Sequence, residues 1–209
     1  MARYIEPSCR LCRREKQKLF LKGTKCFTEK CPVEKRNFPP GQHGSVRRVK
    51  VSEYGVQLRE KQKVRRTYGL LEAQFRTYFD RALKQTGRTG ETLVKLLERR
   101  LDNVIYRLGL APSRKAARQL VHHRHFMVNS KIVDVPSHLL SPGDVVQVRD
   151  RSKKLEVIHS SMKRMRDSAM LPWLSLDKAN LTGTFLNVPD RVDVPLNANE
   201  QLIVELYSK

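Results

Sequence analysis

Apolar residues recur at helical spacing in the middle of the chain. They fall on one face of a helix between residues 97 and 108, which Gly109 ends. Ser113 then stands as the expected N-cap of a second helix, whose narrow apolar stripe consists of Ala117, Leu120 and Val121. The pattern therefore predicts two consecutive helices.

Short β-rich runs follow these helices. Residues 125–128 and 131–135 meet at Asn129–Ser130, and a turn over residues 141–144 leads into a third run, 145–148. We expect the helices and a small sheet to form one compact module.

The flanking sequence predicts further elements. Ser52 is expected to cap a helix that ends at Gly69, and residues 71–86 form a second amphipathic helix. Residues 172–177 and 184–188 are expected strands, whereas the terminal run 199–209 suits either a helix or a strand.

The second helix of the module has an unusual charge arrangement. Arg114 and Lys115 occupy its first turn, where the helix dipole disfavours cations, and Arg118 and His122 follow at intervals of one turn. Free backbone N–H groups and cations at one point suit an anion. A solvated face is the alternative, but the basic chain favours a helix that binds phosphate.

Composition supports a nucleic-acid partner. The 209 residues include 42 Lys and Arg against 21 Asp and Glu, a net charge of +21. Residues 1–50 alone hold 14 basic against 4 acidic residues. Such an excess of positive charge indicates that the protein binds a polyanion. The sequence has neither an apolar run of the roughly 18 residues that a membrane span needs nor a signal-peptide core, so we expect a cytoplasmic protein without a membrane partner.

The cysteines are confined to the N-terminal arm. Cys9-x2-Cys12 and Cys26-x4-Cys31 have the spacing of tetrahedral zinc ligands (Zn2+), and a 4Fe-4S cluster is the alternative. Disulfides do not suit the cytosol. The arm has few large apolar residues, so the metal is expected to nucleate its fold; these residues are Leu11, Leu19, Phe20, Leu21 and Phe27.

Basic and polar residues outside the arm complete the candidate sites. We expect no catalytic group. The predicted RNA-binding residues are Arg47, Arg48, Lys50, Arg59, Lys63, Arg66, Arg114, Lys115, Arg118, Gln119, His122, His123 and Arg124.

Several motifs resemble a known family. LDNVIYRLGLAPSRKAARQLV, HFMVN, VDVPS and SPGD resemble the RNA-binding module named after small-subunit ribosomal protein four. Pseudouridine synthases, some aminoacyl-tRNA synthetases and small stress proteins share that module. The flanking PPGQHG, LREKQKVRRTYG and QFR…YF resemble the bacterial ribosomal family itself.

This resemblance implies an α+β fold in which the module is an insertion. A metal-binding arm (1–45) precedes a mainly helical first domain (46–93), which the tail (180–209) completes; the module spans 94–179. The implied function is that of a structural, primary ribosomal-RNA binder, which grips a junction in the 5′ region and nucleates assembly of the subunit body. Contacts with small-subunit protein five, linked to translational accuracy, and with messenger RNA where it enters the subunit are also implied. An RNA-modifying enzyme or an RNA-binding adaptor is the alternative.

Two positions depart from the family pattern. Arg124 and Ser130 stand where relatives usually have glycine. Both residues must adopt a left-handed conformation, at about 1–2 kcal/mol each, or the turns are rebuilt.

Overall fold

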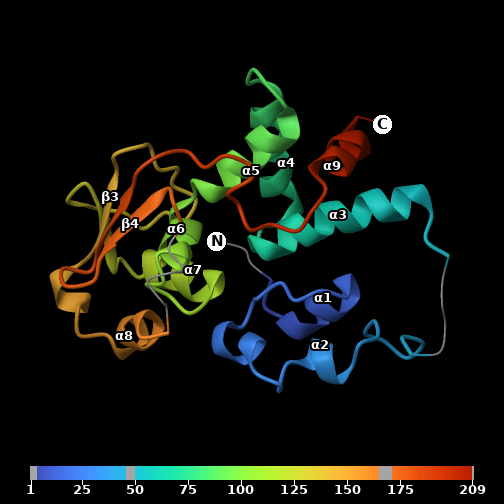
Figure 1. Cartoon of the computed structure of the whole chain (residues 1–209), viewed down its shortest axis with the longest axis horizontal. Helices are drawn as coiled ribbons and strands as arrows, with labels where there is room; N and C mark the ends of the chain where they lie inside the picture. Colours follow the sequence, from blue (N-terminus) through green and yellow to red (C-terminus); the bar gives the residue numbers. More distant parts are fainter. Residues whose placement is uncertain (1–3, 46–49, 165–170, 209) are drawn as a thin grey trace. The chain divides into compact units, whose positions relative to one another are not determined.

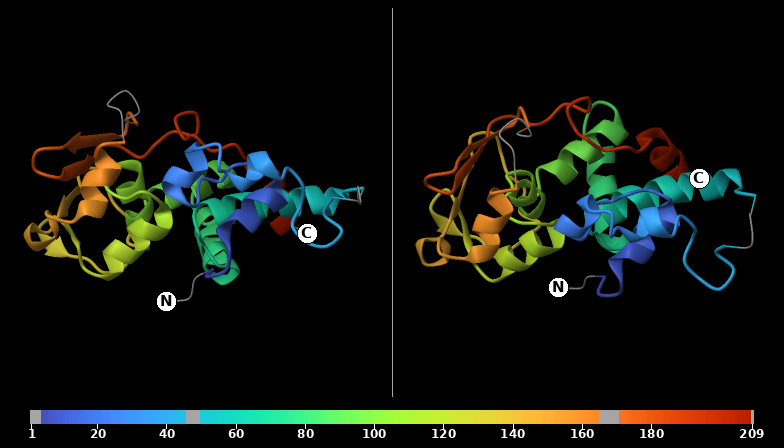
Figure 2. Two further views of the ribbon diagram at one scale, coloured as in Figure 1. Left: turned by 90° about the horizontal axis from the view of Figure 1, so that it is seen from below. Right: turned by 60° about the horizontal axis from the view of Figure 1, so that its bottom comes forward.

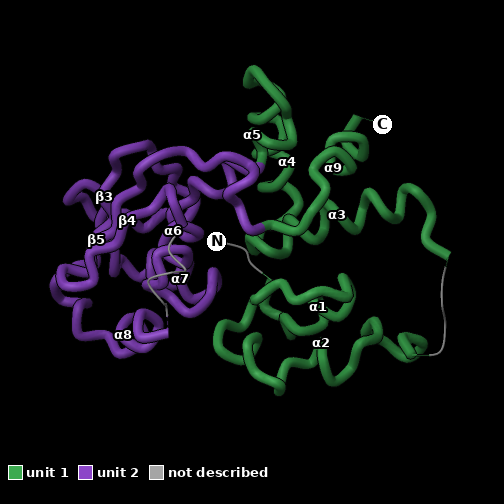
Figure 3. Tube along the Cα trace, viewed as in Figure 1, with its two compact units in different colours: residues 1–93, 196–209 green, residues 94–195 purple. Residues whose placement is uncertain are grey.

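The computed structural model describes residues 4–45, 50–164 and 171–208. It divides into two compact units, residues 1–93 with 196–209 and residues 94–195 (Figure 3). Residues 180–195 were expected in the first domain, and that boundary is wrong. They lie in the second unit because strand β5 (Thr182–Phe185) pairs there.

The first unit is helical. Its arm contains α1 (Ser8–Glu15), a 3-10 turn (Gly23–Phe27) and α2 (Pro32–Lys35). The helices α3 (Glu53–Thr67) and α4 (Glu72–Leu83) follow, and α5 (Thr89–Glu98) contains the boundary between the units. The predicted cap of α3 is confirmed, because the Ser52 hydroxyl accepts a hydrogen bond from the Gly55 N–H at 3.2 Å.

The chain's C-terminal run is a helix, α9 (Glu200–Tyr207), which lies beside α3 (Figure 1, Figure 2). Its Tyr207 ring stacks on Phe79, with 4.4 Å between centroids. The Tyr207 hydroxyl donates to Glu72, which also accepts from Lys61 at 2.6 Å. Burial alone would raise the pKa of Glu72, but these two hydrogen bonds, together with the positive charges of Lys61 and Arg65, outweigh it and lower the pKa. Contacts with the rest of the first unit therefore favour a helix for this run, because the hydrophobic periodicity fitted a helix and a strand alike.

The second unit places helices against an antiparallel sheet. The helices are α6 (Leu101–Arg107), α7 (Arg114–His122) and α8 (Glu156–Met162), with a 3-10 turn at Asp150–Ser152. The strands β1 (Phe126–Val128), β2 (Lys131–Ile132), β3 (Val145–Val148), β4 (Leu174–Asp177) and β5 are ordered β2-β1-β3-β5-β4. The two later strands thus extend the module's sheet.

The core of this unit explains a glycine in β5. Gly183 lies against the buried side chain of Leu108, and a Cβ added there would meet Leu108 Cδ1 at 2.4 Å. The close approach lets α6 lie directly on the sheet.

The helix expected over residues 97–108 is interrupted. α5 ends at Glu98, Arg100 is extended (φ −67°, ψ 135°), and α6 begins at Leu101. The N–H groups of Leu101 and Asp102 donate to the carbonyls of His138 and Pro136, at 2.9 and 3.1 Å. Carbonyl groups of a neighbouring loop therefore accept hydrogen bonds from the first N–H groups of α6, which has no side-chain cap.

The predicted left-handed positions are confirmed. Arg124 has φ 61° and Ser130 has φ 64°, and Asn129 joins them at φ 47°. Because Val128 pairs with Lys131, Asn129 and Ser130 form a two-residue hairpin loop in which both residues have positive φ, as a type I′ turn requires.

A buried ion pair supports the helix break. The fully buried Arg100 guanidinium donates to both carboxylate oxygens of Asp102, at 3.0 and 2.6 Å. Removing one partner of such a pair leaves an uncompensated buried charge.

We expect Asp102→Ala to lower the free energy of unfolding by about 3–5 kcal/mol, measured by denaturant titration. Asp134→Ala is the matched control, because it removes an exposed ion pair with Arg124 and should cost no more than about 1 kcal/mol. Equal losses in the two variants would contradict a structural role for the buried pair.

Candidate nucleic-acid interface

The start of α7 has the predicted geometry. The Ser113 hydroxyl accepts from the Ala116 N–H at 3.3 Å, which confirms the cap. The first turn contains no acidic residue. Arg114 and Lys115, both half-buried, therefore flank a helix N-terminus whose backbone N–H groups and dipole favour an anion.

Arg114 is positioned by a chain of polar contacts from the core. Its Nε donates to the Asn103 side-chain oxygen at 2.8 Å, and its guanidinium lies 4.5 Å from the centroid of the Tyr106 ring. Buried Asn103 in turn donates to Glu98 Oε2 at 2.7 Å. Arg107 forms a bidentate hydrogen-bonded ion pair with the same buried carboxylate. The arginine is thus fixed by α6 and by the end of α5.

Arg118 lies beside a second buried carboxylate. Its side chain is only 12% exposed, and its Nη1 lies 3.8 Å from Asp102 Oδ2, on the carboxylate that Arg100 also binds. The charge pattern did not predict this neighbour, because it compared Arg118 only with the other basic residues of its own helix. Asp102 and Asn103, two polar residues between the apolar positions of α6, were the available signal in the sequence.

The other predicted residues of the module gather at the C-terminal end of α7. Gln119, His122, His123 and Arg124 are exposed, and the His122 and His123 rings lie 6.4 Å apart. Arg124 forms an exposed ion pair with Asp134 at 3.0 Å. We define the α7 surface as Arg114, Lys115, Arg118, Gln119, His122 and His123.

His125 lies next to this surface and contacts the buried Ser152 hydroxyl at 2.8 Å. Burial, followed by the nearby His123 and Arg149, lowers the pKa of His125. Its imidazole therefore favours the neutral form and adds no charge to the α7 surface at neutral pH.

Two of the predicted cations on α3 anchor the arm. Arg59 and Arg66 both donate to the carboxylate of Glu15 at the end of α1, whose side chain is only 1% exposed. Lys63 pairs with Glu60 at 2.5 Å. The two contacts with Glu15 hold the arm on α3, a role that was not predicted from the sequence.

The basic run after the arm is described only in part. Lys50 is exposed. Arg47 and Arg48 lie outside the described residues.

The four cysteines lie in the arm as expected, three of them buried and Cys9 partly exposed. Burial raises the pKa of the Cys12 thiol to about 11, and the other three thiols act in the same direction. The Lys22 N–H donates to Cys26 Sγ at 3.3 Å. Soft thiolates suit zinc. In the ranges 4–45, 50–164 and 171–208, however, no three His, Cys, Asp or Glu residues are grouped so that they could hold a metal ion. The metal stays a prediction.

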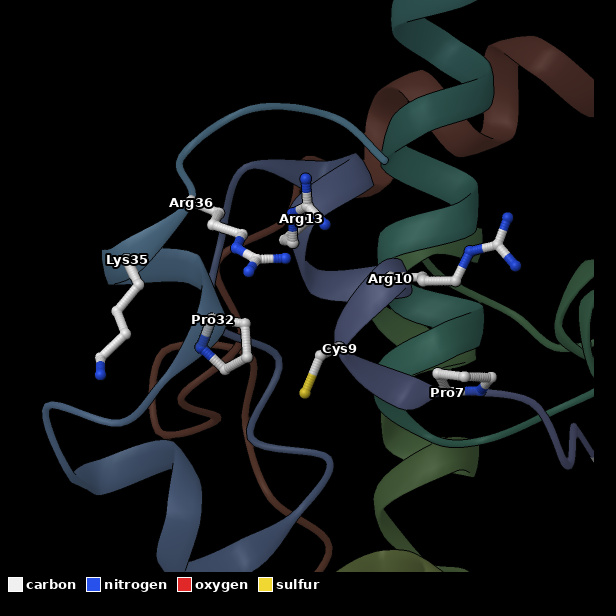
Figure 4. Close-up of a pocket in the computed structure, with 7 residues that line it drawn as sticks. All are labelled: Pro7, Cys9, Arg10, Arg13, Pro32, Lys35 and Arg36. Carbon is white, nitrogen blue, oxygen red and sulfur yellow. The ribbon is translucent and has the colours of Figure 1, made fainter. Parts of the chain in front are cut away.

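A pocket of about 320 Å³ opens beside Cys9 (Figure 4). It is lined by Pro7, Cys9, Arg10, Arg13, Pro32, Lys35 and Arg36. Arg13 Nε donates to the Phe38 carbonyl at 3.1 Å, and its guanidinium lies over the Phe38 ring. Figure 4 shows the charged ends of Arg10 and Lys35 pointing away from the hollow, so these cations add positive charge to the surface around it and not to its interior.

Comparisons with known proteins cover the whole chain. Residues 3–98 match the family described as the ribosomal protein S4/S9 N-terminal domain, and residues 99–146 match the S4 domain. Small ribosomal subunit protein uS4 of Magnetococcus marinus is 57% identical over 209 residues, which is all of both chains. The proteins of the same name from Syntrophobacter fumaroxidans and Thermodesulfovibrio yellowstonii are 56% and 54% identical, again over the full length of both chains. In the described part of the chain, no helix has the length and apolar character of a membrane span.

The left-handed Arg124 allows a test of both backbone and binding. We expect Arg124→Gly to leave stability equal or slightly higher, because glycine relieves about 1 kcal/mol of strain while the exposed ion pair and chain entropy offset part of it. RNA binding should weaken, because a cation beside the α7 surface is lost. Thermal melts and RNA titrations measure the two effects.

Arg124→Gln is the matched control. It removes the same charge but keeps the Cβ, so it should weaken RNA binding equally without a gain in stability. A clear loss of stability in Arg124→Gly would contradict the strain argument.

Proposed function

Since the chain belongs to the uS4 family of small ribosomal subunit proteins, we propose that it grips the RNA of that subunit through the α7 surface. A structural role in the small ribosomal subunit and binding to ribosomal RNA follow from the family itself. The proposal concerns which residues make the contact and how they are prepared for it.

The observation that carries this proposal is the support beneath α7. The hydrogen bond from Arg114 to Asn103 fixes one guanidinium before any RNA arrives, and one helical turn further on Arg118 lies 3.8 Å from the Asp102 carboxylate. Fixed guanidiniums lose little side-chain entropy on binding. Phosphate groups on a folded RNA are also spaced by its shape, so rigid cations can recognise that shape without reading bases.

The arm is proposed as a second RNA-binding region. Arg10, Arg13, Lys35 and Arg36 surround one pocket, and the first 50 residues have a net charge of +10. Because phosphate neutralisation releases counterions, this charge should contribute strongly at low salt.

Finer aspects of the function are also proposals. We propose that the chain binds a junction in the 5′ region of the ribosomal RNA and nucleates assembly of the subunit body. Contacts with small-subunit protein five and with messenger RNA near its point of entrance, and a role in accuracy, are supported only by resemblance. The proposed place of action is the ribosome in the cytoplasm. An RNA-modifying enzyme or adaptor is not favoured, because full-length relatives carry the ribosomal name.

We propose zinc for the arm on the strength of its cysteine spacing and its small core. Cys12, Leu19 and Leu21 are the buried residues of that core, with Leu11 and Val33 partly buried against them. Such a core is too small to fold the arm without a further cross-link. Cys9, Cys12, Cys26 and Cys31 would hold the ion, which would act structurally.

Lys115 tests the α7 surface at a cation that is neither of the two arginines beside Asn103 and Asp102. Lys115→Gln should weaken binding to a transcript of the 5′ region and make log K less steep against log salt, by up to about one unit. Lys178→Gln, in the exposed turn between β4 and β5, should leave both quantities unchanged. Filter binding across a salt series gives both values. Equal behaviour of the two variants would remove Lys115 from the interface.

Elemental analysis tests the metal. Freshly purified protein should hold one zinc per chain, or iron if a cluster is present. Cys26→Ser should lose the metal and disorder residues 1–36, while circular dichroism and melting of the central module stay unchanged. Finding neither zinc nor iron in the native protein would overturn this proposal.

A further inference from the structure

Two aromatic rings of the arm are exposed and stacked on each other. Phe20 and Phe27 have ring centroids 5.0 Å apart with 29° between their planes. Phe27 is 71% exposed and Phe20 is 37% exposed. Both belong to the few large apolar residues of the arm that were judged too few to hold its fold alone. The structure instead buries Leu19 and Leu21 there and leaves the two rings outside.

The backbone at Phe20 is held in an uncommon conformation. Its φ is 52°, in the left-handed region that bulky L-residues rarely adopt. The neighbours Leu19 and Leu21 both point into the core, so the backbone turn directs the Phe20 ring outward, against Phe27. Phe20 keeps 37% of its surface exposed and Phe27 keeps 71%, so burial of the pair offsets this cost only in part. Backbone strain of this kind often marks a functional site.

Cations lie in the short loop that joins the two rings. Lys22 and Lys25, both exposed, are between Phe20 and Phe27 in the sequence, and exposed Lys30 follows. Exposed Glu29 is the acidic residue closest in sequence to Phe27. An aromatic face bordered by lysines is complementary to a nucleotide, which has an apolar base and an anionic phosphate.

We propose that the Phe20–Phe27 pair is a stacking platform for an unpaired base of RNA, with Lys22 and Lys25 neutralising the neighbouring phosphates. The outer face of the Phe27 ring receives the base. Single-stranded segments fit this site because duplex RNA offers no open base face along its length. Little base preference is expected, since every base has a π-face. The proposal rests on the proposed function insofar as the RNA is that of the small subunit.

Affinity measurements test the platform in the full chain. Phe27→Ala and Phe27→Leu should each weaken binding to the 5′-region transcript by about 5-fold to 150-fold, whereas Phe27→Tyr should keep wild-type affinity. The slope of log K against log salt should not change, because no charge is removed. Ile5→Ala is the matched control, since Ile5 is an apolar residue of the same arm that is 82% exposed, and it should bind normally.

A spectroscopic variant separates this proposal from the function on which it rests. The chain's single tryptophan, Trp173, is buried, so Phe27→Trp adds a surface fluorophore. Single-stranded oligouridylate should quench the added fluorescence, and a blunt RNA duplex of equal charge should not.

Three results would overturn the platform, and a fourth would overturn the function on which it rests. Wild-type affinity in Phe27→Ala would overturn the platform. Wild-type affinity in Phe27→Leu would also overturn it, because an apolar contact without stacking would then suffice. Absence of quenching would also overturn it. If the wild-type chain failed to bind the transcript while oligouridylate still quenched Phe27→Trp, the proposed function would fail and the platform would stand.

Discussion

Charged groups buried in the second unit constrain the rest of that unit. Glu98, Arg100 and Asp102 are removed from water at the junction of α5 and α6. Burying an ionised group costs several kcal/mol unless a partner of opposite charge and further hydrogen bonds compensate it. Arg107 compensates Glu98, and Asp102 compensates Arg100. The helix breaks between these residues, and there the carbonyls of His138 and Pro136 accept hydrogen bonds from the backbone N–H groups of Leu101 and Asp102.

The same two pairs extend to the candidate interface. From Glu98 the contacts run through Asn103 to Arg114, and from Arg100 they run through Asp102 to Arg118. Each path ends on an arginine of α7. The orientation of Arg114 and the position of Arg118 therefore depend on the charges buried beside the helix break. In the first unit Glu15 acts comparably, since it holds Arg59 and Arg66 and so joins the arm to α3.

Features set by local sequence could be predicted. The cap at Ser113, the strand at residues 145–148 and the strain at Arg124 each depend on a few neighbouring residues. The helix break could not be predicted, because the apolar spacing stays in phase across it. The partners of Arg59 and Arg66 could not be predicted either, since Glu15 lies 44 and 51 residues away. The exposure of Phe27 could not be predicted, because the composition of the arm does not show which apolar residues its small core leaves exposed.

The central claim is that the buried network orients α7 for RNA. A double-mutant cycle between Asn103→Ala and Arg114→Gln, measured as affinity for the 5′-region transcript, tests it most directly. If Asn103 acts through Arg114, the two changes share one loss, and the coupling energy should be about 1 kcal/mol or more. Losses that add to within about 0.3 kcal/mol would show that Asn103 serves the core alone, and would contradict the account.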